Sequence, residues 1–211
     1  MAEELFDIYD EQLRPIGTAT RAETHARGYW HRTFHCWLTR REGDRRFAWF
    51  QLRQEGKDTN PGCFDITAAG HLAAGESVRE AVRELEEELG VSAAFEQLIP
   101  LCRVREEASG EVNGARFIDR EISDVFALVY DLPLAGLKLQ PEEVAGVYEA
   151  DLDQLIALFE GSLDEAPAIG VRLDGNTGNL TRESRSVKAD QFVPRDPAYY
   201  VDVLRALRDC T

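Results

Sequence analysis

The sequence has no long uninterrupted apolar run and no excess of basic residues. Its 211 residues include 24 lysines and arginines against 39 aspartates and glutamates, which gives a formal net charge of −15. A membrane-spanning helix needs about 20 consecutive apolar residues, so none is expected. Extended nucleic acid is disfavoured as a partner because binding to a phosphate backbone relies on a basic surface. The first residues also lack the basic and apolar regions of a signal peptide, which favours a cytoplasmic protein.

Cysteine is scarce and widely spaced. The four cysteines form no Cys-x-x-Cys pair; they are Cys36, Cys63, Cys102 and Cys210. This pattern fits reduced thiols better than a disulfide framework or a zinc cluster. A small phosphorylated partner is still compatible with the acidic composition, because it needs only a local basic patch and metal ions that screen the carboxylates.

What the chain does contain is the composition of a globular protein, with 44% hydrophobic and 30% charged residues. Its length suits a single domain spanning residues 1–211. Side-chain patterns predict strands at 31–40, 45–53, 65–69, 97–104, 116–130 and 144–149. They predict helices at 77–89, 151–160 and 197–208, a connector at 164–170, and a loop or hairpin tip at 175–179. Strands on both sides of a central helix, without a regular βαβ repeat, favour a mixed sheet between helices.

The central helix carries three glutamates on one face. Glu84, Glu87 and Glu88 stand at helical positions i, i+3 and i+4. Like charges repel there, and the helix dipole disfavours anions in the C-terminal half. A bound divalent cation would remove both penalties. The alternative is an ordinary solvated acidic face.

The sequence also predicts where this helix begins and ends. Ser77 and Glu80 have the spacing of a capping box at the start, and Gly90 is placed just past the end. An apolar stripe runs beside the acidic one and predicts a buried flank; its members are Val78, Ala81, Val82, Leu85 and Leu89.

Residues 70–91, GHLAAGESVREAVRELEEELGV, resemble the signature of the Nudix hydrolases. Gly70 and Glu76 match its opening, and Arg83, the three glutamates and Gly90 match its close. Between Glu76 and Arg83 the chain is one residue shorter than the usual pattern. The tighter junction threatens the pairing of Glu76 with Arg83, but it leaves the spacing of the three carboxylates unchanged. The resemblance implies a Nudix-type α/β/α sandwich with a mixed sheet.

A second resemblance covers roughly residues 5–72 and is to type I isopentenyl-diphosphate isomerases, which share the Nudix fold. It rests on FDIYDEQLRPIGTATRAETHARGYWHRTFHCWL and FQLRQEGKDTNPGCFDITAAGHL. The resemblance implies a second metal site at His25, His31 and His71. It also implies that a diphosphate is held by Arg21, Arg53 and Lys57. Without a metal, the histidines would instead make hydrogen bonds within the fold or contact the substrate phosphate.

The isomerase's catalytic cysteine has no counterpart, because Ala69 stands immediately before Gly70 and His71. Isomerisation needs an acid and a base, and alanine can neither donate nor accept a proton. We therefore reject the isomerase and expect a pyrophosphohydrolase that uses Mg²⁺ or Mn²⁺ and a small phosphorylated substrate of the nucleotide type. A nucleotide-binding regulator without activity is the first alternative, although such proteins usually have an eroded signature; an isopentenyl-diphosphate isomerase-like enzyme is a second, less favoured one.

The resemblance to the Nudix signature implies that Glu84, Glu87 and Glu88 are both metal ligands and catalytic residues, and that Glu84 or another carboxylate activates the water. Glu121 is the best carboxylate outside the signature, because it matches a metal-facing glutamate of the isomerases; it could equally be a solvated strand residue. Glu142 and Glu143 are weaker candidates. The helix start at 196–200 either caps the pocket or contributes to a homodimer contact.

Overall fold

The structure, a computed structural model, describes residues 4–112, 114–175 and 177–211. Its strands are β1 (Leu5–Tyr9), β2 (Pro15–Thr20), β3 (Trp30–Glu42), β4 (Arg45–Arg53), β5 (Phe64–Ile66), β6 (Ala68–His71), β7 (Ile99–Val112), β8 (Ala115–Val129), β9 (Val144–Asp151), β10 (Ala166–Leu173) and β11 (Leu180–Val187). Its α-helices are α1 (Arg21–Arg27), α2 (Arg83–Leu89), α3 (Leu152–Phe159) and α4 (Pro197–Cys210). Short 3₁₀ turns lie at Glu80–Val82, Phe95–Gln97, Leu134–Gly136 and Ala189–Gln191.

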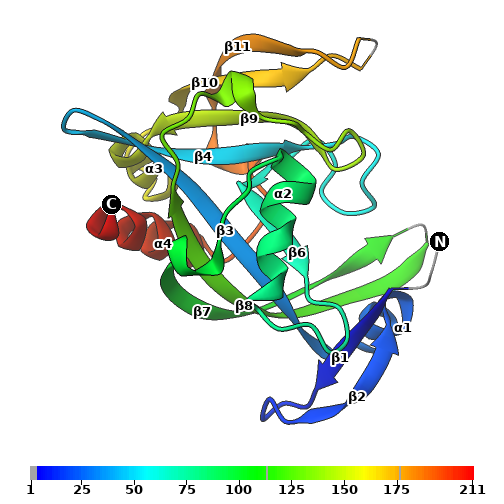
Figure 1. Ribbon diagram of the computed structural model, residues 1–211. Helices are drawn as coiled ribbons and strands as arrows, with labels where there is room; N and C mark the ends of the chain where they lie inside the picture. The colour runs from blue at the N-terminus through cyan, green and yellow to red at the C-terminus, as the bar shows by residue number, and fades with distance from the viewer. Residues whose placement is uncertain (1–3, 113, 176) are drawn as a thin grey trace.

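The strands form one mixed sheet with β3 at its centre (Figure 1). β3 runs parallel to β8 over ten residue pairs, from Trp30↔Arg120 to Thr39↔Val129. The other pairings of β3 are antiparallel, with β1, β4 and β6. Beyond β4 the sheet continues through β9, β10 and β11.

Helices cover both faces of the sheet, and each face has its own apolar core. On one face α2 contributes Leu85 and Leu89, which pack with Trp49 and Val147. On the other face α3 and α4 pack together against the sheet in a cluster that contains Trp37, Phe50, Tyr148, Leu155 and Leu204. Figure 1 shows α2 in front of the sheet and the pair α3 and α4 to one side of it. This is the predicted arrangement of a mixed sheet between helices.

The sheet splits in the middle, and this split places the functional residues. β3 pairs with β4 only from Thr39 to Glu42. Before that point β3 pairs with β6, while β4 pairs with β5, so two short strands line the gap between two diverging long ones. The sequence predicts one strand at 65–69, but the chain forms two strands there because β5 and β6 follow different partners.

One other sequence expectation is wrong, and several elements were missed. The predicted connector at 164–170 is largely strand β10, whose alternating buried residues Ala166 and Ala168 are too small to give a clear strand signal. It pairs with β9 and with β11, which was not predicted either. The predicted tip at 175–179 lies between these strands, with residue 176 outside the described residues. The elements β1, β2 and α1 were also missed.

The central helix is shorter than the predicted 77–89. α2 begins at Arg83, after a 3₁₀ turn at Glu80–Val82. A 3₁₀ turn has three residues where an α-turn has 3.6, which accommodates the shortened spacing between Glu76 and Arg83. Half of the expected capping box forms, because the Glu80 carboxylate accepts from the Ser77 amide at 2.9 Å. Gly90 ends the helix as predicted, in the left-handed region at φ 68°.

Predicted helices 151–160 and 197–208 correspond to α3 and α4, and predicted strands 45–53 and 116–130 to β4 and β8. β7 continues eight residues beyond its predicted end at residue 104, so that β7 and β8 form a long hairpin. None of the helices in the described part of the chain has the length and apolar character needed to cross a bilayer.

Candidate active site

A cavity of about 990 Å³ opens at the split in the sheet. It is bordered by β3, β4, β6, β7, β8, α2 and the start of α4. Ten side chains were predicted to bind metal or phosphate or to act in catalysis, and nine of them line this cavity. The nine are Glu84, Glu87, Glu88, Glu121, Arg21, Arg53, Lys57, His25 and His71. His31 is fully buried behind this lining, where its ring stacks on His71. The fold therefore brings residues from both resemblances to one place.

Of the three glutamates predicted to bind metal, two are buried and one is exposed. Glu84 and Glu88 are 9% and 6% exposed, whereas Glu87 lies at the surface. Burial raises the pKa of Glu84 to about 7 and also raises the pKa of Glu88. The two carboxylates therefore stand close to each other in a place that disfavours negative charge.

Gly70 makes room for Glu84. A Cβ atom at residue 70 would lie 2.2 Å from the Glu84 carboxyl carbon. Only glycine allows the β6 backbone to approach the helix so closely. This contact gives a physical reason for the glycine at the opening of the signature.

Arg83 connects the loop to the acidic face. Its Nε donates to Glu76 at 2.8 Å, so the shorter junction preserves this pair. Its Nη1 lies 2.8 Å from both Glu84 and Glu87. Arg83 thus neutralises part of the glutamate face, and it holds Glu87 at the rim.

Glu88 is held differently. One of its oxygens, Oε2, accepts from the Gln51 side chain and from the Ala69 backbone amide, each at 3.3 Å. The residue that replaces the isomerase cysteine therefore contributes its backbone, and the Ala69 methyl group brings no acid or base.

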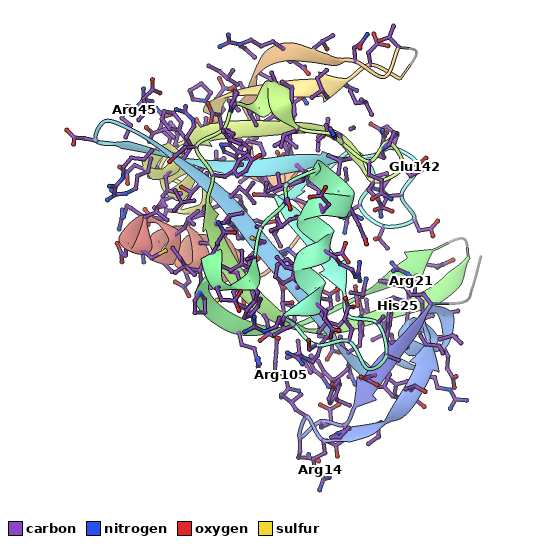
Figure 2. The ribbon with its side chains drawn as sticks, viewed as in Figure 1. Arg14, Arg21, His25, Arg45, Arg105 and Glu142 are labelled. Carbon is purple, nitrogen blue, oxygen red and sulfur yellow. The ribbon has the colours of Figure 1, made fainter. Side chains whose placement is uncertain are left out.

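The three histidines meet at the other end of the cavity. His25 comes from α1, His31 from β3 and His71 from β6, and each places a ring nitrogen within 4.8 Å of the others. Figure 2 shows Arg21 and His25 together at the α1 end of the molecule. Burial lowers the pKa of His31 to about 4, so this imidazole is neutral at physiological pH. Its Nδ1 lies 3.1 Å from the Tyr29 carbonyl oxygen; donation there leaves Nε2 free to bind a cation.

Two carboxylates on β8 complete this cluster. Asp119 Oδ1 lies 3.4 Å from His25 Nε2 and 3.5 Å from His31 Nε2. Glu121 Oε1 lies 3.6 Å from His71 Nε2, so Glu121 faces the cluster and is not a solvated strand residue. Asp119 was missed by the sequence analysis. Its signal was the alternation Asp119-x-Glu121 on one strand, which puts both side chains on the same face.

The cluster has the features of a cation site. Within the described residues, no hydrogen-bond partner reaches four of its buried atoms: Nε2 of His25, His31 and His71, and Oδ1 of Asp119. Buried polar atoms are almost always paired because leaving them unpaired costs free energy. A cation between them would satisfy all four. Imidazole nitrogens with carboxylates suit Mn²⁺, Zn²⁺ and similar ions better than Mg²⁺.

The α2 glutamates do not converge in the same way. Among the described residues, the groups of three ligand atoms that lie within 4.8 Å are two: the three histidines, and His31 with Asp119 and Glu121. Glu84 and Glu88 are oxygen ligands of the kind that Mg²⁺ prefers. Their burial and raised pKa values fit a cation at this end too.

The predicted phosphate-binding cations differ in how free they are. Arg53 has all three donor groups in use, to Asp65 at 3.0 Å and to the carbonyls of residues 59 and 60. Lys57 pairs with Glu143. Glu142, labelled in Figure 2, is exposed and does not line the cavity. Arg21 is half-exposed, pairs with Glu4 at 3.2 Å and lies 3.3 Å from His71 Nδ1.

A further charged group in the cavity lining was not predicted. Arg195, which precedes α4, pairs with Glu106 on β7 and with Asp65 on β5. Tyr199 of α4 lies beneath the Arg195 guanidinium, and its hydroxyl is 3.0 Å from His35 Nδ1. These residues carry no motif, because they come together only through the sheet and the packing of α4.

Comparisons with known proteins agree with the motifs. A protein-family model described as the NUDIX domain matches residues 29–169. The chain is 40% identical over 209 residues to an uncharacterised Nudix hydrolase of Clostridium acetobutylicum, with 99% of each chain covered. It is also 33% identical over 156 residues to an isopentenyl-diphosphate Delta-isomerase of Clavibacter michiganensis, covering 72% of this chain and 75% of that one. Both resemblances predicted from the sequence are confirmed.

A solved structure supports the fold. The crystal structure of the Deinococcus radiodurans protein DR0079 matches with a TM-score of 0.53 and 21% identity, over 75% of this chain and 90% of that chain. This likeness concerns the fold alone, and it confirms the predicted Nudix-type sandwich.

Proposed function

We propose a function on the basis that the chain belongs to the Nudix hydrolase family. Members of this family are in general pyrophosphohydrolases of nucleoside diphosphate derivatives, and they use divalent metal ions. The proposed reaction is cleavage of a phosphoanhydride bond in a small nucleotide or other diphosphate compound, with Mg²⁺ or Mn²⁺. We also propose that residues 1–211 act as one Nudix domain. The observation that carries the proposal is the burial of Glu84 and Glu88 side by side in a cavity that also holds cationic side chains.

The basic residues account for substrate binding. Arg21 and Lys57 line the cavity, and each is paired with a single carboxylate, Glu4 or Glu143. A diphosphate, with more charge and more acceptor oxygens than a carboxylate, would compete for both side chains. Arg53 is fixed between Asp65 and the loop, so its part is to shape the Lys57 loop and add positive charge.

The acidic residues account for the chemistry. Glu84, Glu87 and Glu88 would hold Mg²⁺ or Mn²⁺, and the histidine cluster with Asp119 and Glu121 would hold a second ion. When bound, these ions supply positive charge that stabilises the transferring phosphoryl group and lowers the pKa of water. Glu84 would also accept the proton of the attacking water, because its carboxylate lines the cavity next to the proposed ions.

Turnover of a substrate panel tests the proposal. The panel contains nucleoside diphosphates, nucleoside triphosphates and sugar-linked nucleoside diphosphates, each with Mg²⁺ or Mn²⁺, and the readout is release of phosphate, pyrophosphate or nucleoside monophosphate. Glu84→Gln is expected to lower kcat by about 10²- to 10⁴-fold, the usual range for loss of an acid–base group.

Glu86→Gln is the matched control, since Glu86 lies on the same helix but is exposed and outside the cavity lining. Its activity should equal that of the unmodified protein. Tight nucleotide binding without turnover of any compound would instead favour a regulator that lacks activity.

A further inference from the structure

The cavity has a charged wall built around Arg195. Arg195 Nη1 donates to Glu106 Oε2 at 2.6 Å, and its Nη2 lies 3.4 Å from Asp65 Oδ1. The guanidinium is 5.2 Å from the centre of the Tyr199 ring. The proposed hydrolysis assigns no role to Arg195, Glu106 or Tyr199, although all three line the same cavity.

This wall is rigid and largely desolvated. The side chains of Asp65, Arg195 and Glu106 are 3%, 11% and 16% exposed. Asp65 is also fixed by Arg53, and it accepts from the Ile66 amide at 2.9 Å. Breaking an ion pair that is buried to this degree would destabilise the protein, so these pairs stay intact. A ligand that enters the cavity therefore meets charged side chains on this wall.

Glu106 stands next to the histidine end of the cavity. In the antiparallel pair of β7 and β8 it lies directly opposite Glu121, which faces the histidine cluster. Side chains directly opposite in such a pair have their Cβ atoms about 5 Å apart and point to the same face. Arg195 engages Oε2 of Glu106, and Oε1 is the remaining acceptor oxygen on this carboxylate.

We propose that Glu106, held in place by Arg195, is a specificity-determining residue that selects a diphosphate whose attached group carries hydroxyls, such as a sugar ring, and rejects one that carries a hydrocarbon tail. This inference rests on the proposed function, because it concerns the substrate of the same site. A hydroxyl next to the phosphates can donate a hydrogen bond to Oε1 of the Glu106 carboxylate.

A hydrocarbon tail would be excluded by desolvation. It would cover the part of Glu106 and Arg195 that is still exposed without offering a hydrogen bond, and buried polar groups left in that state are costly. Sites built to hydrogen-bond a substrate hydroxyl reject analogues that lack it by up to about 10⁴- to 10⁵-fold. Prenyl diphosphates are the appropriate competitors, given the similarity of the chain to isopentenyl-diphosphate isomerases.

The test compares ADP and CDP with isopentenyl and geranyl diphosphate, the last of which is closer to a nucleoside diphosphate in size. We expect the unmodified protein to favour the nucleoside diphosphates in kcat/KM by at least about 100-fold. Glu106→Leu should shift this ratio towards the prenyl compounds by tenfold or more. Glu106→Gln keeps an acceptor for Arg195 and should shift it less. Glu111→Gln is the control, because Glu111 is exposed on the same strand and lies outside the cavity lining.

Calorimetric binding of the same compounds to the same variants gives a second readout that does not need turnover, and thermal unfolding shows that each variant is folded. A preference of the unmodified protein for prenyl diphosphates, or a ratio that both Glu106 variants leave unchanged, would overturn the inference. Failure to turn over any compound would count against the proposed hydrolysis, whereas the binding ratio would still decide the role of Glu106.

Discussion

The α2 glutamates and the histidine cluster border one cavity but are built in different ways. Glu84, Glu87 and Glu88 lie within five residues on one helix, and Arg83 on the same helix neutralises part of their charge. The histidine cluster draws residues from four elements, α1, β3, β6 and β8. Its ligand-type atoms form two overlapping groups of three, each within 4.8 Å, and four of the atoms lack hydrogen-bond partners in the described part of the chain.

The difference concerns how ready each cluster is to bind a cation. The histidine cluster has its geometry fixed by the sheet, so little reorganisation is needed. In the glutamate cluster, Glu84 and Glu87 share Arg83, and this ion pair must loosen before both can bind an ion. A substrate that brings its own metal and phosphates would supply the charge that loosens it. We therefore expect the histidine cluster to bind an ion without substrate, and the glutamate cluster to bind ions together with substrate.

Gly70→Ala should have the largest effect, and on the glutamate cluster alone. The new Cβ would meet the Glu84 carboxylate, which has to move away because the backbone cannot. Misplacing a catalytic group by about 1 Å can cost about 100-fold in rate, so a fall in kcat of that order is expected in the hydrolysis assay. Gly56→Ala is the control, since nothing lies within 4 Å of a Cβ there. Unchanged activity of Gly70→Ala would show that the close contact with Glu84 is dispensable.

His31→Asn should have the next largest effect, and on the histidine cluster alone. It removes one of the converging Nε2 atoms, so the affinity for Mn²⁺ in the absence of substrate should fall by about 10- to 100-fold, as when other parts of metal sites are lost. Paramagnetic resonance of Mn²⁺ measures the free ion directly. His35→Asn serves as the comparison, because His35 lies on the same strand but contacts Tyr199. Equal Mn²⁺ affinity in both variants would contradict a metal site at the histidines.

The smallest effect is on the pH dependence of stability without metal. Burial raises the pKa of Glu84 from 4.5 to about 7, so the stability linked to this group is complete below about pH 4.5 and is lost as the pH rises through 7. The lowered pKa of His31 acts in the opposite direction, with stability lost as the pH falls from 6.5 towards 4. The test therefore compares the Tm of a Glu84 variant with that of the unmodified protein at each pH.

Relative to the unmodified protein, Glu84→Gln should have a Tm that rises between pH 5 and pH 8. One pKa unit corresponds to about 1.4 kcal/mol, and 1 kcal/mol to about 2–4 °C for a chain of this length. The gain should thus be several degrees in thermal unfolding with a chelator present. If the difference between the two Tm values does not change with pH, the folded protein does not raise the pKa of Glu84.

Local sequence patterns were sufficient for the parts of the fold that depend on neighbouring residues. The Gly90 helix end, strand β4 and helix α4 follow from short-range signals, and they appear as predicted. The small alanines of β10 and the short strands β1 and β2 carry weak local signals. Their conformation depends on pairing, of β10 with β9, of β1 with β3 and of β2 with β1. The break between β5 and β6 likewise depends on two different partner strands.

The sequence by itself determined the family and the acidic face of α2, because residues three and four apart on a helix are neighbours whatever surrounds them. It could not determine that Asp119 faces His25 and His31, or that Glu106 is held by Arg195 beside Glu121. These contacts join residues about 90 positions apart, and they exist only because the parallel pairing of β3 with β8 and the packing of α4 fix their register. Tertiary structure alone decided which charges meet in the cavity.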